Sequence, residues 1–209
     1  MQLAPLAIDD RTTALLESVR LAFAEKGFDG ASMQDLARAA GMSAGNFYRY
    51  FPSKNAIVAA MVEKDLATVR KDFEEVLVSS DPVEALIGAF ERRIDAMNSC
   101  DGPLWAEIDA AASRKPEIAA AVSAMESAVT GLLGIVFARI SGCPPEQPRK
   151  DYAAECCFLM MLYKGAALWV VSKGYGTSQD TRYALRGLIL QTIRQTISDI
   201  AAPKLQQMS

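Results

Sequence analysis

Residues 32–54 read SMQDLARAAGMSAGNFYRYFPSK and contain two short helix patterns separated by one glycine. Gly41 suits the end of the first helix because glycine adopts a left-handed backbone conformation without strain. Ser43 can cap the second helix, because its hydroxyl oxygen can accept a hydrogen bond from a backbone N–H of the first turn. Phe47 and Phe51 lie four residues apart and therefore share one side of that helix. The stretch predicts a helix-turn-helix unit with these two phenylalanines in its core.

The remaining surface of the second helix carries side chains suited to DNA. Gly45 is small enough to let the backbone approach base edges in a major groove. Asn46 can donate and accept hydrogen bonds, and Arg49 can pair with guanine or with phosphate. Tyr48 and Lys54 can bind phosphates and so set the register of the protein on the duplex. The alternative is a helical corner that binds nothing, and both descriptions allow the phenylalanines to be buried.

The wider stretch around residues 24–63 carries a set of residues typical of one family. They are Phe23, Gly27, Phe28, Ser32, Met33, Leu36, Ala37, Ala40, Gly41, Ser43, Gly45, Phe47, Tyr48, Tyr50, Phe51 and Lys54. In these residues the chain resembles the DNA-binding domain of TetR-family transcriptional regulators. The resemblance implies an all-helical homodimer with a variable ligand-binding domain behind the DNA-binding one. The DNA-contacting residues predicted from the pattern and the resemblance are Ser32, Gln34, Ser43, Ala44, Gly45, Asn46, Tyr48, Arg49 and Lys54.

The charge of the chain argues against nonspecific coating of DNA. Its formal net charge is −3 over 209 residues, and acidic and basic residues balance one another in the N-terminal part. Affinity for DNA is therefore expected to depend on the local placement of side chains and on dimerisation, not on a broad basic field. Hydrophobic residues make up 51% of the chain, which is enough for a sizeable core.

The chain contains no histidine, which removes the most common acid–base residue and metal ligand. It also lacks a glycine-rich phosphate loop and a convergent set of Cys, Asp and Glu. We therefore expect neither an enzyme nor a bound metal or cofactor. The four cysteines are Cys100, Cys143, Cys156 and Cys157. None has zinc-finger spacing, so buried free thiols are expected, with a thiol-based redox sensor as the alternative.

The N-terminal residues lack the basic cluster and the apolar run of a signal peptide. The most apolar stretches downstream are interrupted by Glu126 and Lys164 before they reach the length of about twenty residues that a membrane helix needs. We therefore expect a cytoplasmic protein with buried helices and without a membrane span.

Beyond residue 54 apolar residues recur at helical spacing, and neither strand alternation nor an internal repeat is visible. Asp81-Pro82 is a strong helix start, because a capping residue precedes a proline at the first helical position. Residues 142–148, GCPPEQP, form the clearest loop pattern. Helices outside the helix-turn-helix are expected over about 11–26, 53–76, 81–97, 104–112, 115–141, 149–173 and 178–201. The predicted fold class is all-α with about nine helices: a three-helix DNA-binding domain over 9–54 and a ligand-binding and dimerisation domain over 55–203.

The helices after the DNA-binding domain offer two further sets of candidate residues. Aromatic and methionine side chains suit an adaptable apolar ligand pocket, with core packing as the alternative. They are Phe90, Met97, Trp105, Met125, Phe137, Met160, Tyr163 and Trp169. Apolar residues of the last two helices suit a four-helix dimer interface, with coverage of their own core as the alternative. They are Cys156, Met160, Tyr163, Ala167, Val170, Ile189, Ile193, Ile197 and Ile200.

Together these features predict a ligand-responsive, sequence-specific transcriptional repressor. As a homodimer it would bind a palindromic operator in double-stranded DNA, and a small lipophilic effector would release it. The long helix that begins near Ser53 spans the two predicted domains and is the expected lever between them. The alternatives are a thiol-based redox-sensing regulator and a helical interaction module without an effector.

Overall fold

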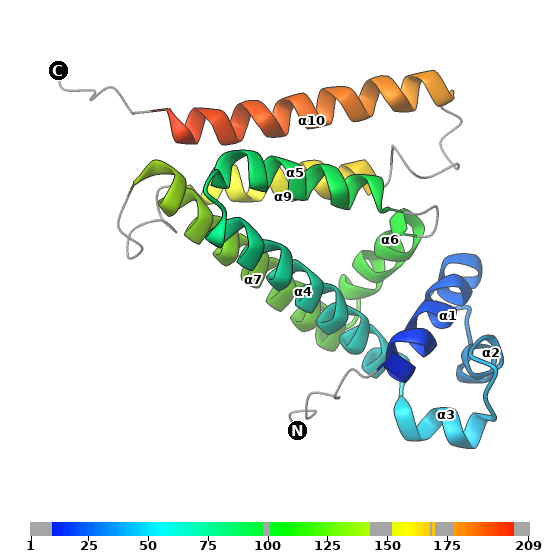
Figure 1. Ribbon diagram of the computed structural model, residues 1–209. Helices are drawn as coiled ribbons and strands as arrows, with labels where there is room; N and C mark the ends of the chain where they lie inside the picture. Colours follow the sequence, from blue (N-terminus) through cyan, green and yellow to red (C-terminus); the bar gives the residue numbers. More distant parts are fainter. Residues whose placement is uncertain (1–9, 98–100, 143–151, 168, 170–177, 203–209) are drawn as a thin grey trace. The chain divides into compact units, whose positions relative to one another are not determined.

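The computed structural model describes residues 10–97, 101–142, 152–167, 169 and 178–202. The regular elements in these ranges are α-helices, with residues 167 and 169 in π-helical conformation and no strand among the described residues, which confirms the predicted all-α class (Figure 1). The helices are α1 (Asp10–Lys26), α2 (Met33–Ala39), α3 (Ala44–Tyr50), α4 (Lys54–Val78), α5 (Pro82–Asp95), α6 (Asp101–Ala112), α7 (Pro116–Ser141), α9 (Ala153–Ala166) and α10 (Gln179–Ala201). The loop predicted over 142–148 lies outside the described residues except for Gly142.

Several helix boundaries follow the local signals in the sequence. A side-chain oxygen of Asp81 accepts a hydrogen bond from the backbone N–H of Glu84 at 3.0 Å, so α5 begins at its predicted cap. The hydroxyl of Ser178 caps α10 in the same way. Gly27 and Gly41 follow α1 and α2 with φ of +73° and +65°, the left-handed region that glycine adopts without strain.

The chain divides into two compact units. The first contains α1, α2, α3, α6, the part of α4 up to Thr68 and the part of α7 up to Met125. The second contains α5, α9, α10 and the remaining parts of α4 and α7. The predicted 9–54 domain lies inside the first unit, which is larger because α6 and the adjoining parts of α4 and α7 pack with it.

The first unit has one apolar core to which the helices before and after the predicted domain boundary contribute. Phe23 of α1, Phe47 of α3 and Met61 of α4 are fully buried in it. Leu104 and Ile108 of α6 join the same cluster, and α6 packs against α1. The helix-turn-helix therefore shares its core with a helix that lies far from it in the sequence.

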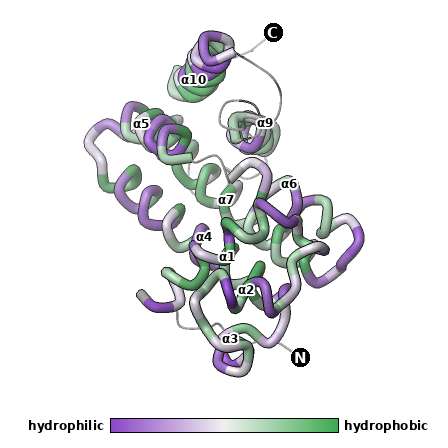
Figure 2. The backbone as a smooth tube through the Cα atoms, turned by 90° about the vertical axis from the view of Figure 1, so that its right-hand side faces the viewer, coloured by the Kyte–Doolittle hydropathy of each residue, from purple (hydrophilic) through white to green (hydrophobic). Residues whose placement is uncertain are grey.

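In the second unit α10 packs against both α5 and α9, and Figures 1 and 2 show the three helices together. Ion pairs reinforce the contact between α10 and α5. Arg186 of α10 bonds both carboxylate oxygens of Asp95 at 2.8 Å, and Arg194 bonds Glu84 at 2.6 Å. Figure 2 shows both hydrophilic and hydrophobic segments on α10, as expected for a helix with one buried side.

Among the described helices, α7 is the one whose length and composition would allow it to cross a membrane. A core helix of a water-soluble protein has the same composition. Leu133, Val136 and Phe137 of α7 are fully buried inside the chain, and Glu126 on the same helix forms an ion pair with Lys164 at 2.6 Å. These contacts agree with the expected buried helix.

Replacing Phe47 with alanine should lower the free energy of unfolding by about 3–5 kcal/mol, because the side chain is fully buried and a cavity would remain. Urea denaturation followed by circular dichroism measures this. The control is Tyr48→Ala on the same helix, whose side chain is 47% exposed and whose loss should cost about 0.5 kcal/mol or less. Equal effects of the two substitutions would contradict this assignment of the two faces of α3.

Candidate nucleic-acid interface

The short helix α3 is fixed at its start by a cap and along its length by aromatic packing. The hydroxyl oxygen of Ser43 accepts a hydrogen bond from the backbone N–H of Asn46 at 3.4 Å. Phe47 and the C-cap residue Phe51 have no exposed surface, and their ring centroids lie 5.4 Å apart. The predicted helix start and the predicted burial of both phenylalanines are confirmed. The side of α3 opposite these rings is therefore held in a fixed position.

The outer side of α3 presents most of the residues predicted to contact DNA. Ser43, Gly45, Tyr48 and Arg49 are exposed, while Ala44 and Asn46 are half-buried. A Cβ built at Gly45 would meet no atom within 4 Å, so packing inside the described chain does not require a glycine there. The arrangement leaves a small, open position beside a phenol and a guanidinium, which can approach base edges and phosphates.

At the start of α2 a capping box engages Ser32, another predicted DNA contact. The backbone N–H of Asp35 donates to the Ser32 hydroxyl at 3.1 Å, and the backbone N–H of Ser32 donates to Asp35 at 3.0 Å. Lys26 bonds the other oxygen of Asp35 at 2.6 Å. The hydrogen bonds from Lys26 and Ser32 hold the pKa of the Asp35 carboxyl well below its usual range. Gln34, in the first turn of α2, is exposed.

Lys54, also predicted to hold phosphate, forms hydrogen bonds within the protein. Its ammonium group donates hydrogen bonds to the carbonyl oxygens of Phe28 at 2.7 Å and Asp29 at 3.2 Å. It also lies 5.0 Å from the centre of the Phe28 ring. Burial, followed by the charge of Lys115, lowers the pKa of Lys54. The first role of this residue is therefore to tie the start of α4 to the α1–α2 loop.

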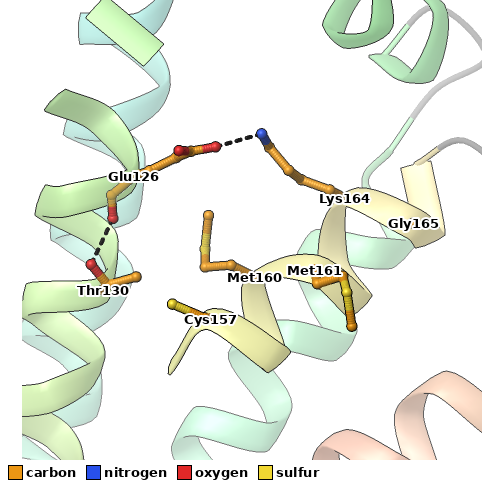
Figure 3. A pocket seen from close by; sticks show the side chains of 7 residues that line it. All are labelled: Glu126, Thr130, Cys157, Met160, Met161, Lys164 and Gly165. Carbon is orange, nitrogen blue, oxygen red and sulfur yellow. Dashed lines mark hydrogen bonds and ion pairs between the residues drawn. The ribbon is translucent and has the colours of Figure 1, made fainter. Parts of the chain in front are cut away.

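The second unit contains a groove between α7 and α9, shown in Figure 3. Its volume is about 450 Å³, and its lining residues are Glu126, Thr130, Cys157, Met160, Met161, Lys164 and Gly165. Apolar and sulfur-containing side chains form most of the wall. The ion pair between Glu126 and Lys164 bridges α7 and α9 beside it (Figure 3).

The eight predicted ligand-binding residues are divided between the two units. Trp105 and Met125 pack against the apolar core of the first unit, and the other six lie in the second unit. There Phe137 is fully buried and Phe90 nearly so, whereas Met160 lines the groove. Met97 and Tyr163 are half-buried, and Trp169 is exposed. Burial of these side chains fits core packing and the wall of an enclosed pocket equally, so the ligand pocket stays a prediction.

The isoleucine stripe of α10 faces the interior of its own chain, which corrects its assignment to the dimer interface. Ile189, Ile193, Ile197 and Ile200 are all buried without a partner chain, because α10 packs against α5 and α9. On α9, Cys156 is buried and Met160 lines the groove, while the buried Ala167 is its C-cap residue. Tyr163 lies beneath the guanidinium of Arg93, and Val170 is outside the described residues.

The two adjacent cysteines of α9 point to different sides of the helix. Cys156 is buried and Cys157 is exposed, and both are free thiols. Burial raises the pKa of the Cys156 thiol to about 12. Cys156 is therefore a protonated thiol at neutral pH, and the redox-sensor alternative gains no support from it because the thiolate is the reactive form. Cys100 and Cys143 lie outside the described residues.

Comparison with known proteins places this geometry in a family. Residues 15–61 match the sequence model of the bacterial regulatory proteins of the tetR family. Over these residues the chain has the DNA-binding region of the TetR family. It is 34% identical to the HTH-type transcriptional regulator EthR of Mycolicibacterium smegmatis over 80 residues, which cover 37% of each protein. It is 31% identical to the HTH-type transcriptional repressor KstR2 of Rhodococcus jostii over 93 residues, covering 43% of this chain and 46% of that one. The matched part thus spans less than half the length of these curated relatives.

The likeness in fold to solved structures extends over nearly the whole chain. The structure of Salmonella enterica GusR superimposes with a TM-score of 0.64 over 91% of this chain and 95% of that one. Sequence identity in that comparison is 21%, so it supports the fold alone. The matched residues 15–61 contain α2, α3 and the packing residues of α1 that hold them.

Two residues that help to shape the DNA-binding unit were given no role in it from the sequence. Glu107 of α6 accepts a hydrogen bond from the backbone N–H of Phe28 at 2.9 Å, and Asp29 bonds Arg114 and Lys115 at 3.1 and 2.6 Å. The sequence separation between partners is 79 or more residues, so local patterns carry no signal for these contacts.

Replacing Asp35 with asparagine should flatten the dependence of stability on pH in acid. The pKa of Asp35 is lowered in the folded chain from its ordinary value of 3.8, so its charged form stabilises the fold above about pH 4. That contribution is lost as pH falls below this value toward the lowered pKa. Urea denaturation at several pH values between about 6 and 2 measures the effect.

The control variant for this series is Asp199→Asn, which removes a carboxyl from α10 and leaves the capping box of α2 intact. An unchanged acid dependence in Asp35→Asn, compared with the wild type, would mean that the ionisation of Asp35 contributes nothing to the stability of the fold.

Proposed function

We propose that this chain is a ligand-responsive transcriptional repressor that binds a palindromic operator as a homodimer and is released by a small lipophilic effector. The observation that carries the proposal is the pinned helix α3. Phe47 and Phe51 are fully buried beneath it, while Tyr48 and Arg49 are exposed beside the open position of Gly45. A cytoplasmic location follows from this proposal, because the operator DNA is there.

The side chains of α3 suggest a division between sequence readout and positioning. Asn46 and Arg49 can make the paired hydrogen bonds that distinguish adenine and guanine in a major groove. Tyr48 can donate to a phosphate, which fixes the register without reading bases. The net charge of −3 supplies no general attraction to DNA. Recognition therefore rests on these few groups, and one copy of a seven-residue helix contacts few base pairs.

Dimerisation would double this small contact surface. In helix-turn-helix dimers the two recognition helices enter successive major grooves about 34–36 Å apart, so the operator is a palindrome. Two half-sites of modest affinity then act together, because the second binds from a high effective concentration. A homodimer thus explains how an acidic chain with a short recognition helix reaches a specific site.

The exposed side of α10 is the part of the described chain best suited to this dimer. Ala184, Gly187, Leu188 and Gln191 form an uncharged, exposed strip at helical spacing, opposite the buried isoleucines. Leu188 is 61% exposed. Exposed Phe158 and Met161 on α9, which packs against α10, add apolar surface. We therefore place the dimer face on this strip instead of the isoleucine stripe.

The groove between α7 and α9 supports an apolar effector. Its methionines are flexible and polarisable, which suits a lipophilic molecule of variable shape. Its volume of about 450 Å³ lies within the range of small-molecule sites. An effector that binds more tightly to one arrangement of the helices than to another would shift the population away from the DNA-binding form.

The DNA-binding part of the proposal is tested with a duplex selected by the full-length protein from a random pool. Arg49→Ala and Asn46→Ala should each weaken binding to that duplex by roughly tenfold or more and relax its sequence preference. Tyr48→Ala should weaken binding to all duplexes by a similar factor, because its contact is to phosphate. Fluorescence anisotropy at fixed salt concentration measures each affinity.

The matched control is Tyr183→Ala, which removes an exposed tyrosine from α10 in the second unit and should leave DNA affinity unchanged. Wild-type affinity in all three α3 variants would reject α3 as the DNA-binding helix. Failure of the wild-type protein to select any sequence would reject the repressor function.

The dimer face is tested with Leu188→Asp, which places a charge in the centre of the uncharged strip. The variant should be monomeric in sedimentation equilibrium at concentrations where the wild type is dimeric, because a buried charge without a partner is costly. Leu21→Asp is the control, since Leu21 of α1 is 55% exposed and lies outside the proposed interface. If Leu188→Asp dimerises as strongly as the wild type, the dimer interface does not include this strip.

A further inference from the structure

The loop between α1 and α2, residues 27–30, is clamped from several directions. Gly27 ends α1 with φ of +73°, and Phe28 turns inward, where it is 2% exposed. The Phe28 ring stacks on Phe23 of α1 with centroids 5.5 Å apart. The backbone of this loop must therefore satisfy its hydrogen bonds next to the apolar core, because a buried N–H without an acceptor destabilises the fold.

The acceptor for this loop comes from α6. The Oε2 atom of Glu107 accepts the hydrogen bond of the Phe28 N–H at 2.9 Å. A Cβ added at Gly27 would lie 3.0 Å from the same oxygen. The absence of a side chain at residue 27 therefore leaves the space that the carboxylate occupies. Glu107 fits closely against the loop and does not lie free in solvent.

The junction of α6 and α7 holds the next residue of the loop. The carboxylate of Asp29 bonds Arg114 at 3.1 Å and Lys115 at 2.6 Å. Hydrogen bonds from Lys115 and Arg114 lower the pKa of Asp29, so it is ionised at neutral pH. The Lys115 ammonium also lies 4.3 Å from the centre of the Phe28 ring. Glu107 and the α6–α7 junction thus hold two consecutive loop residues, Phe28 and Asp29.

Lys54 joins the same loop to the DNA-binding helix. It is the first residue of α4, four residues after the end of α3, and it donates to the carbonyl oxygens of Phe28 and Asp29. Lys54 thus holds two carbonyl groups of the loop. Glu107 holds the Phe28 N–H of the same loop, and the α6–α7 junction holds its Asp29 carboxylate. Loss of the Glu107 contact would therefore change the support of the segment that follows α3.

We propose that Glu107 is a positioning residue for DNA binding: it seats the α1–α2 loop and, through Lys54, fixes the end of the segment that carries α3. Glu107 contacts the loop and not the DNA. The proposal rests on the repressor function for its DNA readout. Loss of the carboxylate would leave the Phe28 N–H without its acceptor.

The test compares Glu107→Ala, Glu107→Gln and the control Glu25→Ala in the full-length protein. Glu25 is an exposed carboxylate on α1, so its loss makes the same change in charge without removing a hydrogen bond to the loop. Glu107→Ala should weaken binding to the selected operator duplex about tenfold, within the range of typical coupling between sites. Glu107→Gln should restore most of the affinity, because its carbonyl oxygen can accept the same hydrogen bond. Glu25→Ala should bind as the wild type does.

A second readout follows the hydrogen bond itself. In amide NMR spectra the Phe28 N–H signal should move upfield in Glu107→Ala, and less so in Glu107→Gln, while its position in Glu25→Ala stays that of the wild type. An unmoved Phe28 signal in Glu107→Ala would overturn the contact. A moved signal with wild-type operator affinity would overturn the positioning role alone.

Equal weakening in Glu107→Ala and Glu107→Gln would also overturn the proposal, because it would point to the loss of charge and not of the hydrogen-bond acceptor. If the wild-type protein selects no duplex, the repressor function itself fails, and the positioning role fails with it. That outcome is recognised from the wild type alone, before any variant is compared.

Discussion

Burial of Phe47 and Phe51 is the interaction on which the DNA-binding unit depends. A seven-residue helix is too short to be stable alone in water, because the first turn costs more conformational entropy than its hydrogen bonds return. Each phenylalanine removed from water contributes roughly 1.5–3 kcal/mol, which offsets that cost. The same packing decides which residues remain outside. Tyr48 and Arg49 are therefore exposed because the burial of Phe47 and Phe51 fixes which side of α3 faces the core.

The dependence of this core on α6 connects folding to the proposed function. Leu104 and Ile108 lie in the cluster that contains the phenylalanines of α1 and α3, and Glu107 between them bonds the α1–α2 loop. One helix thus supplies apolar packing on two turns and a hydrogen-bond acceptor between them. Because α4 and α7 each run from the first unit into the second, the chain offers two continuous elements through which the units are joined.

Features determined by neighbouring residues were predictable from the sequence. The caps Ser43 and Asp81 and the left-handed Gly41 follow from the chemistry of a few adjacent positions, and the structure has them at those positions. Contacts between distant segments were not predictable. Lys54 looked like a phosphate-binding residue because nothing nearby in the sequence indicates Phe28 as its partner. The apolar stripe of α10 predicted a buried side but not which surface would cover it.

The most direct test of the account is hydrogen exchange, measured by mass spectrometry, of the full-length protein with and without its selected operator duplex. The central claim is that the outer side of α3 is the surface that DNA covers. Slower exchange upon DNA binding is expected in peptides that span residues 32–54, with little change in peptides of α10 that face α5 and α9. Unchanged exchange in residues 32–54 of the DNA-bound protein would contradict the account.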